Sequence, residues 1–477
     1  MNPFKYLIVP LVLFTGSIQA APLDEKLATQ DDQKSVAVTI YNNDLALVKD
    51  QRQVNLGAGF NKLAWRDVAA RMQPETALLR NLSDAKGFHL LEQNFDFDLL
   101  TPQTLLEKYV GKQVTVISTN PATGAETREP VTVLATNGGT VLKFGDRIET
   151  GVPGRLAFPG VPDNLRDRPT LVMSMMNPRS GVQNLELSYL TGGLSWRADY
   201  VAELSGQDDT MDLNGWVTLT NQSGASYHNA RLQLVAGDVN RVQAAMPANM
   251  LRGKMQIQAA ETAPLAQENL FEYHLYTLNR PTTLAEQQTK QVALLSATDI
   301  PVRKSLELHG AEYYYQGSYG ELGQKLKVGV FLEFENKGGG LGVPLPKGVI
   351  RLYKKDSAGN AQFIGEDRID HTPKNERVRL KMGDSFDVTA DRKQTDFQKI
   401  GVSGRYNNVF ESAYQVTLKN AKNQPVTVKV FEPFPGDWQV LSESLPHTKE
   451  AAGTALWQVP VAAEGKTVLT YRVRVKY

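Results

Sequence analysis

Residues 185–238 carry the clearest structural pattern in the chain, an alternation of apolar and polar side chains with a period of two. The alternation runs from Leu185 to Tyr189, is interrupted by Gly192-Gly193, and resumes at Leu194. Such a period is that of a β-strand with one buried face, because successive side chains point to opposite faces of a sheet. A Gly-Gly pair between two alternating runs is a turn signal, so we expect the two runs to form a hairpin.

Comparable strands, separated by Gly, Pro, Asn and Asp turns, recur along most of the chain, and they predict an all-β, multi-domain protein of β-sandwich (Ig-like) domains. A stretch poor in strand signal, residues 240–267, is predicted to be a long mobile loop. The expected divisions are a signal peptide at 1–20, a disordered lead-in at 21–35, an N-terminal β domain at 36–184, a central β domain at 185–400 and a C-terminal β-sandwich portion at 401–477.

Residues 101–155 break the pattern of the N-terminal domain and predict an inserted unit. Thr101-Pro102 followed by Leu105, Leu106 and Tyr109 has the capping residue and apolar spacing of a short helix. The following residues, 112–155, consist of short alternating runs between tight turns. Their number and length predict a small SH3-like barrel inserted in the N-terminal domain.

Residues 1–20 have the pattern of a secretory signal peptide: a basic Lys5, an apolar run from Tyr6 to Phe14 and small residues up to Ala20. The apolar run is shorter than the roughly 20 residues that a helix needs to cross a bilayer, so we expect cleavage and export to the periplasm. The pattern is compatible with contact at a membrane surface and predicts no segment that spans a membrane.

The composition of the chain excludes several classes of function. The whole chain has 52 basic and 51 acidic residues, and removal of the predicted signal peptide takes away one basic residue, Lys5. The remaining charges balance, which argues against binding to nucleic acid. The chain has no Cys, which excludes disulfides and thiolate metal sites. Its six His residues lack metal-ligand spacing such as HExxH, so we expect no metal and no cofactor.

Catalytic residues are not recognisable in the sequence. The run from Gly193 to Arg197 places Ser195 after a Gly and lacks the second Gly of a nucleophile elbow, and the pattern continues as a strand where an elbow needs a helix. We therefore predict no catalytic residue and no enzymatic activity.

Aromatic residues provide the candidate binding site. Tyr313, Tyr314 and Tyr315, together with Tyr319, are predicted to place rings on both faces of a strand, so that at least one ring is exposed for stacking on a sugar or a peptide. Trp196, in the alternating stretch described first, is a further candidate.

Several segments together resemble an uncharacterised bacterial envelope family, domain of unknown function 4139. The resemblance extends from about Leu185 to the C-terminus and is carried by Leu194-Ser-Trp-Arg-Ala-Asp-Tyr200, Asn221, Asn229-Ala-Arg-Leu-Gln-Leu-Val-Ala-Gly237, Glu272-Tyr-His-Leu-Tyr276 and Gly340-Leu-Gly-Val-Pro-Leu-Pro-Lys-Gly348. Relatives similar to mucoidy inhibitor A join a β domain to this part through a helical coiled coil, where the present chain has the insert at 101–155. The resemblance implies a β-rich fold and an envelope location and supplies no catalytic residues.

These observations lead to three functional hypotheses. The first is an exported, non-enzymatic protein of a Gram-negative envelope that binds a protein or glycan partner through loops and sheet edges. The second is a periplasmic hydrolase whose site is assembled from acidic residues distant in the sequence. The third is an outer-membrane β-barrel, because the alternation from Leu469 to Tyr477 is typical both of a barrel strand and of the closing strand of a sandwich.

Overall fold

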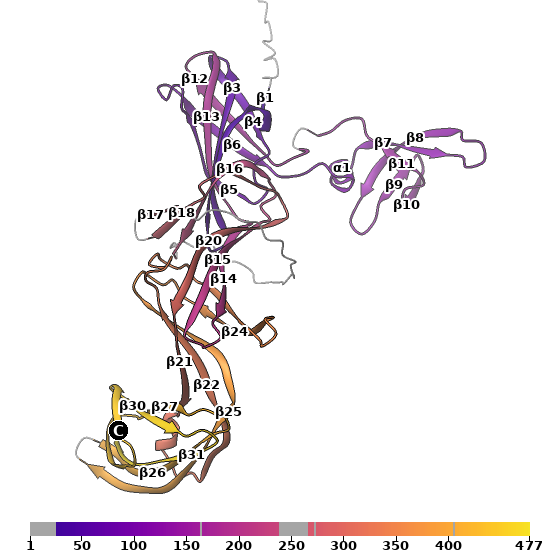
Figure 1. The fold of residues 1–477 in the computed structure, drawn as a ribbon. Coiled ribbons are helices and arrows are strands. Elements are labelled where there is room, and N and C mark those ends of the chain that lie inside the picture. Colours follow the sequence, from indigo (N-terminus) through magenta and orange to yellow (C-terminus); the bar gives the residue numbers. More distant parts are fainter. Residues whose placement is uncertain (1–24, 163–164, 238–265, 271–272, 404–405) are drawn as a thin grey trace, which may run out of the picture.

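The computed structural model describes residues 25–162, 165–237, 266–270, 273–403 and 406–477. It is an elongated molecule, with N-terminal sheets at one end, C-terminal strands at the other and one small unit projecting sideways (Figure 1). The prediction of an all-β protein built from several sheets is confirmed. The expected signal peptide and residues 240–265 of the expected mobile loop lie outside the described residues, while Gln267, at the end of that loop, lies in strand β17.

Two sheets form the N-terminal end of the molecule. The first has the order β1-β4-β12-β6 and consists of β1 (Glu25–Ala28), β4 (Gly59–Arg66), β12 (Thr170–Asn177) and β6 (His89–Asp96). The second has the order β17-β18-β16-β2-β3-β13-β5, with β19 paired to β16. Its strands are β17 (Ala266–Leu270), β18 (Tyr273–Thr277), β16 (Tyr227–Ala236), β2 (Gln33–Tyr41), β3 (Leu45–Leu56), β13 (Gly181–Thr191), β5 (Met72–Asn81) and β19 (Thr282–Leu284).

The prediction of a disordered lead-in at 21–35 is wrong for the residues that the structure describes. Residues 25–35 form strand β1, the short 3-10 helix η1 (Gln30–Asp32) and the start of β2. Strand β1 pairs in parallel with β4, and Glu25 forms an ion pair of 2.7 Å with Arg166.

A buried polar network explains why this polar segment is ordered. Arg52, 1% exposed, donates to the Ala28 carbonyl at 2.8 Å and forms an ion pair of 2.8 Å with Asp50. The Asp50 carboxylate also accepts from the Gln33 amide at 2.8 Å and from the Trp65 indole at 2.9 Å. Because a buried charge is tolerated only when it is paired and hydrogen-bonded, these contacts hold the segment against the sheet.

The expected hairpin on either side of Gly192-Gly193 is also wrong. Strand β13 ends at Thr191 in the second sheet, whereas β14 (Leu194–Leu204) belongs to a third sheet with the order β20-β15-β14-β23-β24. The turn therefore transfers the chain from one sheet to another. The other strands of the third sheet are β20 (Gln288–Pro301), β15 (Thr210–Asn221), β23 (Gly348–Lys355) and β24 (Ala361–Ile369).

All three sheets contribute to one hydrophobic core. Trp65 of the first sheet, Val48 of the second and Trp196 of the third belong to the same buried cluster. Burial of each large apolar side chain contributes about 1.5–3 kcal/mol, so this shared core binds the sheets firmly together. The expected boundary between 184 and 185 falls inside β13 and must be corrected, because the chain has no break in pairing or packing there.

The predicted insert is a separate unit with its own small core. It begins with helix α1 (Pro102–Lys108), capped by Thr101 as expected, and continues as a sheet of order β10-β9-β8-β7-β11. Its strands are β7 (Gln113–Thr119), β8 (Glu126–Ala135), β9 (Val141–Phe144), β10 (Arg147–Thr150) and β11 (Arg155–Ala157). Within the described residues, the end strands β10 and β11 pair only with β9 and β7, so the predicted SH3-like barrel is an open five-stranded sheet. Among the described residues, no helix has the length and apolar character needed to cross a membrane.

The C-terminal end is a sheet of order β28-β31-β26-β25-β22-β21-β27-β30-β29 around a second large core. Its strands are β21 (Arg303–His309), β22 (Glu321–Glu335), β25 (Arg377–Ser403), β26 (Tyr406–Asn420), β27 (Val426–Pro433), β28 (Asp437–Glu443), β29 (His447–Ala451), β30 (Thr454–Val461) and β31 (Lys466–Lys476). The two ends of the sheet pack on each other through the stacked rings of Trp457 and Tyr471, whose centroids are 4.7 Å apart.

The expected boundary between 400 and 401 is corrected by strand β25. This strand pairs with β22 along residues 377–393 and with β26 along residues 388–403, so one continuous ladder passes through position 400. Strands β21 and β22, expected in the central domain, therefore belong to the C-terminal sheet.

The buried Asp50–Arg52 pair gives a test of how the N-terminal segment is held. Arg52→Ala leaves Asp50 buried without its cation, so we expect a loss of about 3–5 kcal/mol in the free energy of unfolding in urea. Limited proteolysis should then cut residues 25–32 faster. The control Arg71→Ala removes an ion pair to Asp44 in which the two side chains are 51% and 56% exposed, and it should cost less than about 1 kcal/mol. Equal losses in the two variants would contradict this assignment.

Candidate functional site

The four candidate tyrosines lie in a turn at residues 311–320, here named the aromatic turn, and not on a strand as predicted. Residues 312–315 form the 3-10 helix η2 (Glu312–Tyr315), which sends successive side chains in different directions. Tyr314 and Tyr315 are buried, whereas Tyr313 and Tyr319 are 51% and 39% exposed. The two exposed rings pack edge to face, with centroids 5.7 Å apart and an interplanar angle of 80°.

The aromatic turn is held in place by the buried side chain of Gln394 on β25. Its amide nitrogen donates to the carbonyls of Tyr314 at 3.3 Å and Gly317 at 3.1 Å, and its carbonyl oxygen accepts from the backbone of Tyr319 at 2.5 Å. The backbone nitrogen of Gln394 also donates to the Gly320 carbonyl at 3.0 Å. These bonds hold the turn in one conformation.

A buried ion pair lies beneath the turn. Arg392 donates to Glu432 at 2.5 Å, and both side chains are fully buried. Tyr315 donates to the other carboxylate oxygen at 2.7 Å, and its hydroxyl lies 2.9 Å from that of Tyr471. Burial raises the pKa of Glu432, and the charge of Arg392 opposes this shift. Burial, with the charge of Glu432, also raises the pKa of Tyr315 far above its usual value, so this phenol remains a proton donor at neutral pH.

Gly310 makes room for this network at the start of the turn. A Cβ atom at position 310 would lie 2.0 Å from a carboxylate oxygen of Glu432, so a larger residue would displace the carboxylate. The ring of Tyr314 lies over the guanidinium of Arg392 at 5.0 Å from the ring centroid, which joins the turn to the charged pair. Tyr314 and Tyr315 are therefore part of the support for the turn and not contact residues.

Trp196, the remaining candidate, lies inside the protein. Its side chain is in the shared core, with 4% of the residue exposed, and its indole nitrogen donates to the Val235 carbonyl at 3.3 Å. Its ring also packs edge to face on Tyr276, with centroids 6.4 Å apart. In this position Trp196 stabilises the packing of two sheets, so the structure brings it together with none of the exposed tyrosines.

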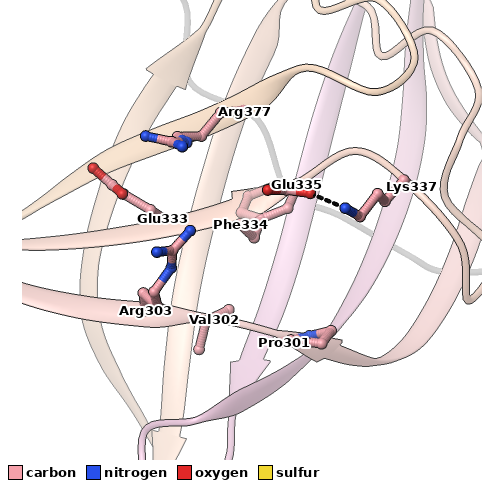
Figure 2. Close-up of a pocket in the computed structure, with 8 residues that line it drawn as sticks. All are labelled: Pro301, Val302, Arg303, Glu333, Phe334, Glu335, Lys337 and Arg377. Atoms are coloured by element: carbon pink, nitrogen blue, oxygen red, sulfur yellow. Dashed lines mark ion pairs between the residues drawn. The ribbon is translucent and has the colours of Figure 1, made fainter.

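A pocket of about 320 Å³ lies where β20, β21, β22 and β25 come together (Figure 2). Arg303 on β21 stands opposite Glu333 on β22, and Arg377 on β25 stands opposite Glu335. Glu335 also pairs with Lys337, and this contact, reinforced by Arg377 and Arg303, lowers the pKa of its carboxyl group. The apolar part of the lining is formed by Pro301, Val302 and Phe334.

The charges of this pocket continue along the same sheet in a cluster around Glu307. Glu307 is 2% exposed and accepts hydrogen bonds from Ser305 at 2.8 Å and from Arg379, and it lies 3.0 Å from the His309 ring nitrogen. Burial acts to raise the pKa of Glu307, but these partners outweigh it and the pKa lies below its usual value of 4.5. The Arg379 guanidinium lies over the ring of Phe331 at 3.8 Å from its centroid.

These charged groups are arranged to neutralise one another. In the Glu307 cluster the carboxylate is central and its partners surround it, whereas a catalytic triad places the histidine between the acid and the nucleophile. The carboxylate of Asp199 on β14 is also surrounded by its partners: it accepts hydrogen bonds from Thr218 at 2.6 Å and from Arg351 at 3.0 Å. Within the described ranges, no group of three or more His, Asp or Glu side chains is arranged to hold a metal ion.

The lowered pKa of Glu307 predicts how stability depends on pH. A carboxyl group with a depressed folded-state pKa stabilises the protein above its unfolded pKa, and this contribution is lost as the pH falls through the folded-state value. Glu307→Gln should therefore lower the free energy of unfolding by about 1.5–3 kcal/mol at pH 7, and the difference from the parent protein should shrink steadily below pH 4.5.

Urea unfolding at a series of pH values measures this difference. The control Glu450→Gln changes an exposed carboxylate on β29 and should leave the curve of the parent protein unchanged. A difference between Glu307→Gln and the parent protein that stays constant down to pH 3 would show that the pKa of Glu307 is not lowered in the folded protein.

Comparison with known proteins places this architecture in a family. No curated protein matches the chain. The family model described as "Domain of unknown function (DUF4139)" matches residues 185–477, from within β13 to the C-terminus, and so covers the third sheet and the C-terminal sheet. The match contains the aromatic turn, the buried Arg392–Glu432 pair and the pocket of Figure 2. The chain therefore belongs to the DUF4139 family.

Proposed function

We propose that this chain is an exported, non-enzymatic protein of a Gram-negative envelope that binds a protein or glycan partner through the aromatic turn. The observation that carries the proposal is the pair of exposed rings, Tyr313 and Tyr319, on a turn fixed by buried Gln394. Large exposed aromatic side chains are typical of binding surfaces, because they bury much area with few rotatable bonds. Because Gln394 already holds the turn in one conformation, less conformational entropy is lost when a partner binds.

The non-enzymatic part of the proposal rests on how the charged groups are used. The carboxylates of Glu307, Glu432 and Asp199 each accept bonds from a cation and from a hydroxyl group, which hold them in place within the fold. Such groups stabilise the fold and are poorly suited to exchange protons during a reaction. Export and a periplasmic location are supported by the signal-peptide pattern of residues 1–20.

The double variant Tyr313→Ala/Tyr319→Ala tests the proposed surface. Loss of two stacking rings should weaken partner binding by about 1–3 kcal/mol, or roughly fivefold to a hundredfold. The measurement is recovery of the partner after cross-linking in cells and purification of the tagged chain. Because both rings are exposed, the thermal unfolding midpoint should change little.

Phe363→Ala is the matched control, since Phe363 is 55% exposed on β24, outside the aromatic turn. It should recover the same partner as the parent protein. Equal recovery by the double variant would exclude the aromatic turn as the contact surface. Turnover of peptidoglycan, exopolysaccharide or peptide by the purified protein, abolished by a single carboxylate substitution, would instead support the hydrolase hypothesis.

A further inference from the structure

A second hollow, of about 550 Å³, lies on the N-terminal part of the molecule and shares no lining residue with the aromatic turn. It is formed on one face of strands β16, β2, β3 and β13. At its centre, Ala37 on β2 stands between Arg231 on β16 and Lys49 on β3, at the same level of the sheet. The small side chain of Ala37, flanked by two long ones, explains why the surface is hollow here.

The hollow carries an excess of positive charge. Arg231, Lys49 and Lys34 line it and are all exposed, and none of the three forms an ion pair with a carboxylate in the described part of the chain. The acidic side chain in the lining is Glu186, which accepts a hydrogen bond of 2.8 Å from the Gln51 amide. Three cations against one carboxylate favour a ligand that brings negative charge.

The rest of the lining is rich in groups that can both donate and accept hydrogen bonds. Ser35 donates to Gln51 at 3.1 Å, and Thr39 donates to Gln233 at 3.3 Å. Hydroxyl and side-chain amide groups that remain at the surface match the hydroxyl groups of a saccharide. The lining contains no aromatic ring and has only Val36, Ala37 and Pro281 as apolar residues, which disfavours a lipid chain.

The sheet also disfavours an extended peptide at this place. Peptides commonly bind by adding a strand to a free sheet edge. Here β2 pairs with both β16 and β3, and β3 pairs with both β2 and β13, so their backbone groups are already used. A ligand in this hollow must be recognised through side chains alone.

We propose that the face formed by Ala37, Lys49 and Arg231 binds an anionic saccharide, with the two cations on its acid group and the Gln and Thr side chains on its hydroxyls. The site is separate from the aromatic turn, and the proposal goes beyond the proposed function because it names a ligand class for a second surface. Part of the lining lies within the region matched by the family model, namely Glu186, Asn229, Arg231, Gln233 and Pro281, and the rest lies before it. Charge pairing with a guanidinium and an ammonium group supplies the affinity.

Isothermal titration of the purified full-length chain with a galacturonic acid tetramer tests this proposal. We expect binding that weakens with added salt, and little binding of a neutral glucose tetramer. Arg231→Gln/Lys49→Gln should weaken binding about tenfold or more, because each charged contact is lost. Ala37→Leu fills the hollow without changing charge and should abolish binding while the thermal midpoint stays close to that of the parent protein.

The control Lys86→Gln/Lys143→Gln removes the same charge from exposed positions outside the hollow and should bind the tetramer as the parent protein does. Tyr313→Ala/Tyr319→Ala should also bind normally, which separates this site from the aromatic turn. Equal binding of the neutral tetramer, full competition by inorganic phosphate at the same concentration, equal binding of an oligoglutamate peptide, or no effect of Ala37→Leu would each overturn the proposal.

Discussion

The turn at Gly192-Gly193 is the constraint on which the arrangement of the sheets depends. Gly193 has a φ of +83°, and a Cβ atom there would lie 2.4 Å from the Gln222 carbonyl oxygen, so the sharp change of direction requires glycine. Its backbone nitrogen donates to Asp44 at 2.7 Å, which ties the turn to the β2–β3 connection. Because the chain passes here from one sheet to the facing one, Trp196 and its neighbours on β14 enter the shared core.

A second constraint is the set of charged pairs placed on the inner faces of strands. Asp50 and Arg52 lie on β3 in the same alternating phase as buried Val48 and Val54, and Arg392 follows buried Ala390 on β25 in the same way. A buried charge must find partners or destabilise the protein by several kcal/mol. Asp50 and Arg52 pair on one strand and also contact Trp65 on β4 and the Ala28 carbonyl on β1, whereas Arg392 on β25 finds Glu432 on β27, so each set of contacts joins separate strands. The N-terminal segment and the aromatic turn are each held next to such a pair.

Period-two alternation predicted the β class and most strands correctly, because one buried face per strand produces that pattern directly. It did not predict pairing partners. The Gly192-Gly193 turn has the composition of a hairpin, yet Thr191 and Leu194 pair in different sheets, a result decided by long-range packing. The ordered segment at 25–35 was missed because its own composition is polar. The signal that could have found it was the presence of Asp50 and Arg52 in the apolar phase of β3.

For the candidate site, the sequence predicted that at least one tyrosine ring is exposed, and it did not predict which rings these are. A run of tyrosines indicates aromatic contact surface, but which rings are exposed depends on η2 and on Gln394, about 75 residues further along the chain. The hollow around Ala37 was beyond prediction for the same reason, since Lys49 and Arg231 meet only through the parallel pairing of β16 with β2. Both surfaces therefore consist of ordinary side chains that become a site through register. In a protein built from long shared strands, the side chains that lie together on one face are decided by the pairing of strands, which the local sequence of each segment does not reveal.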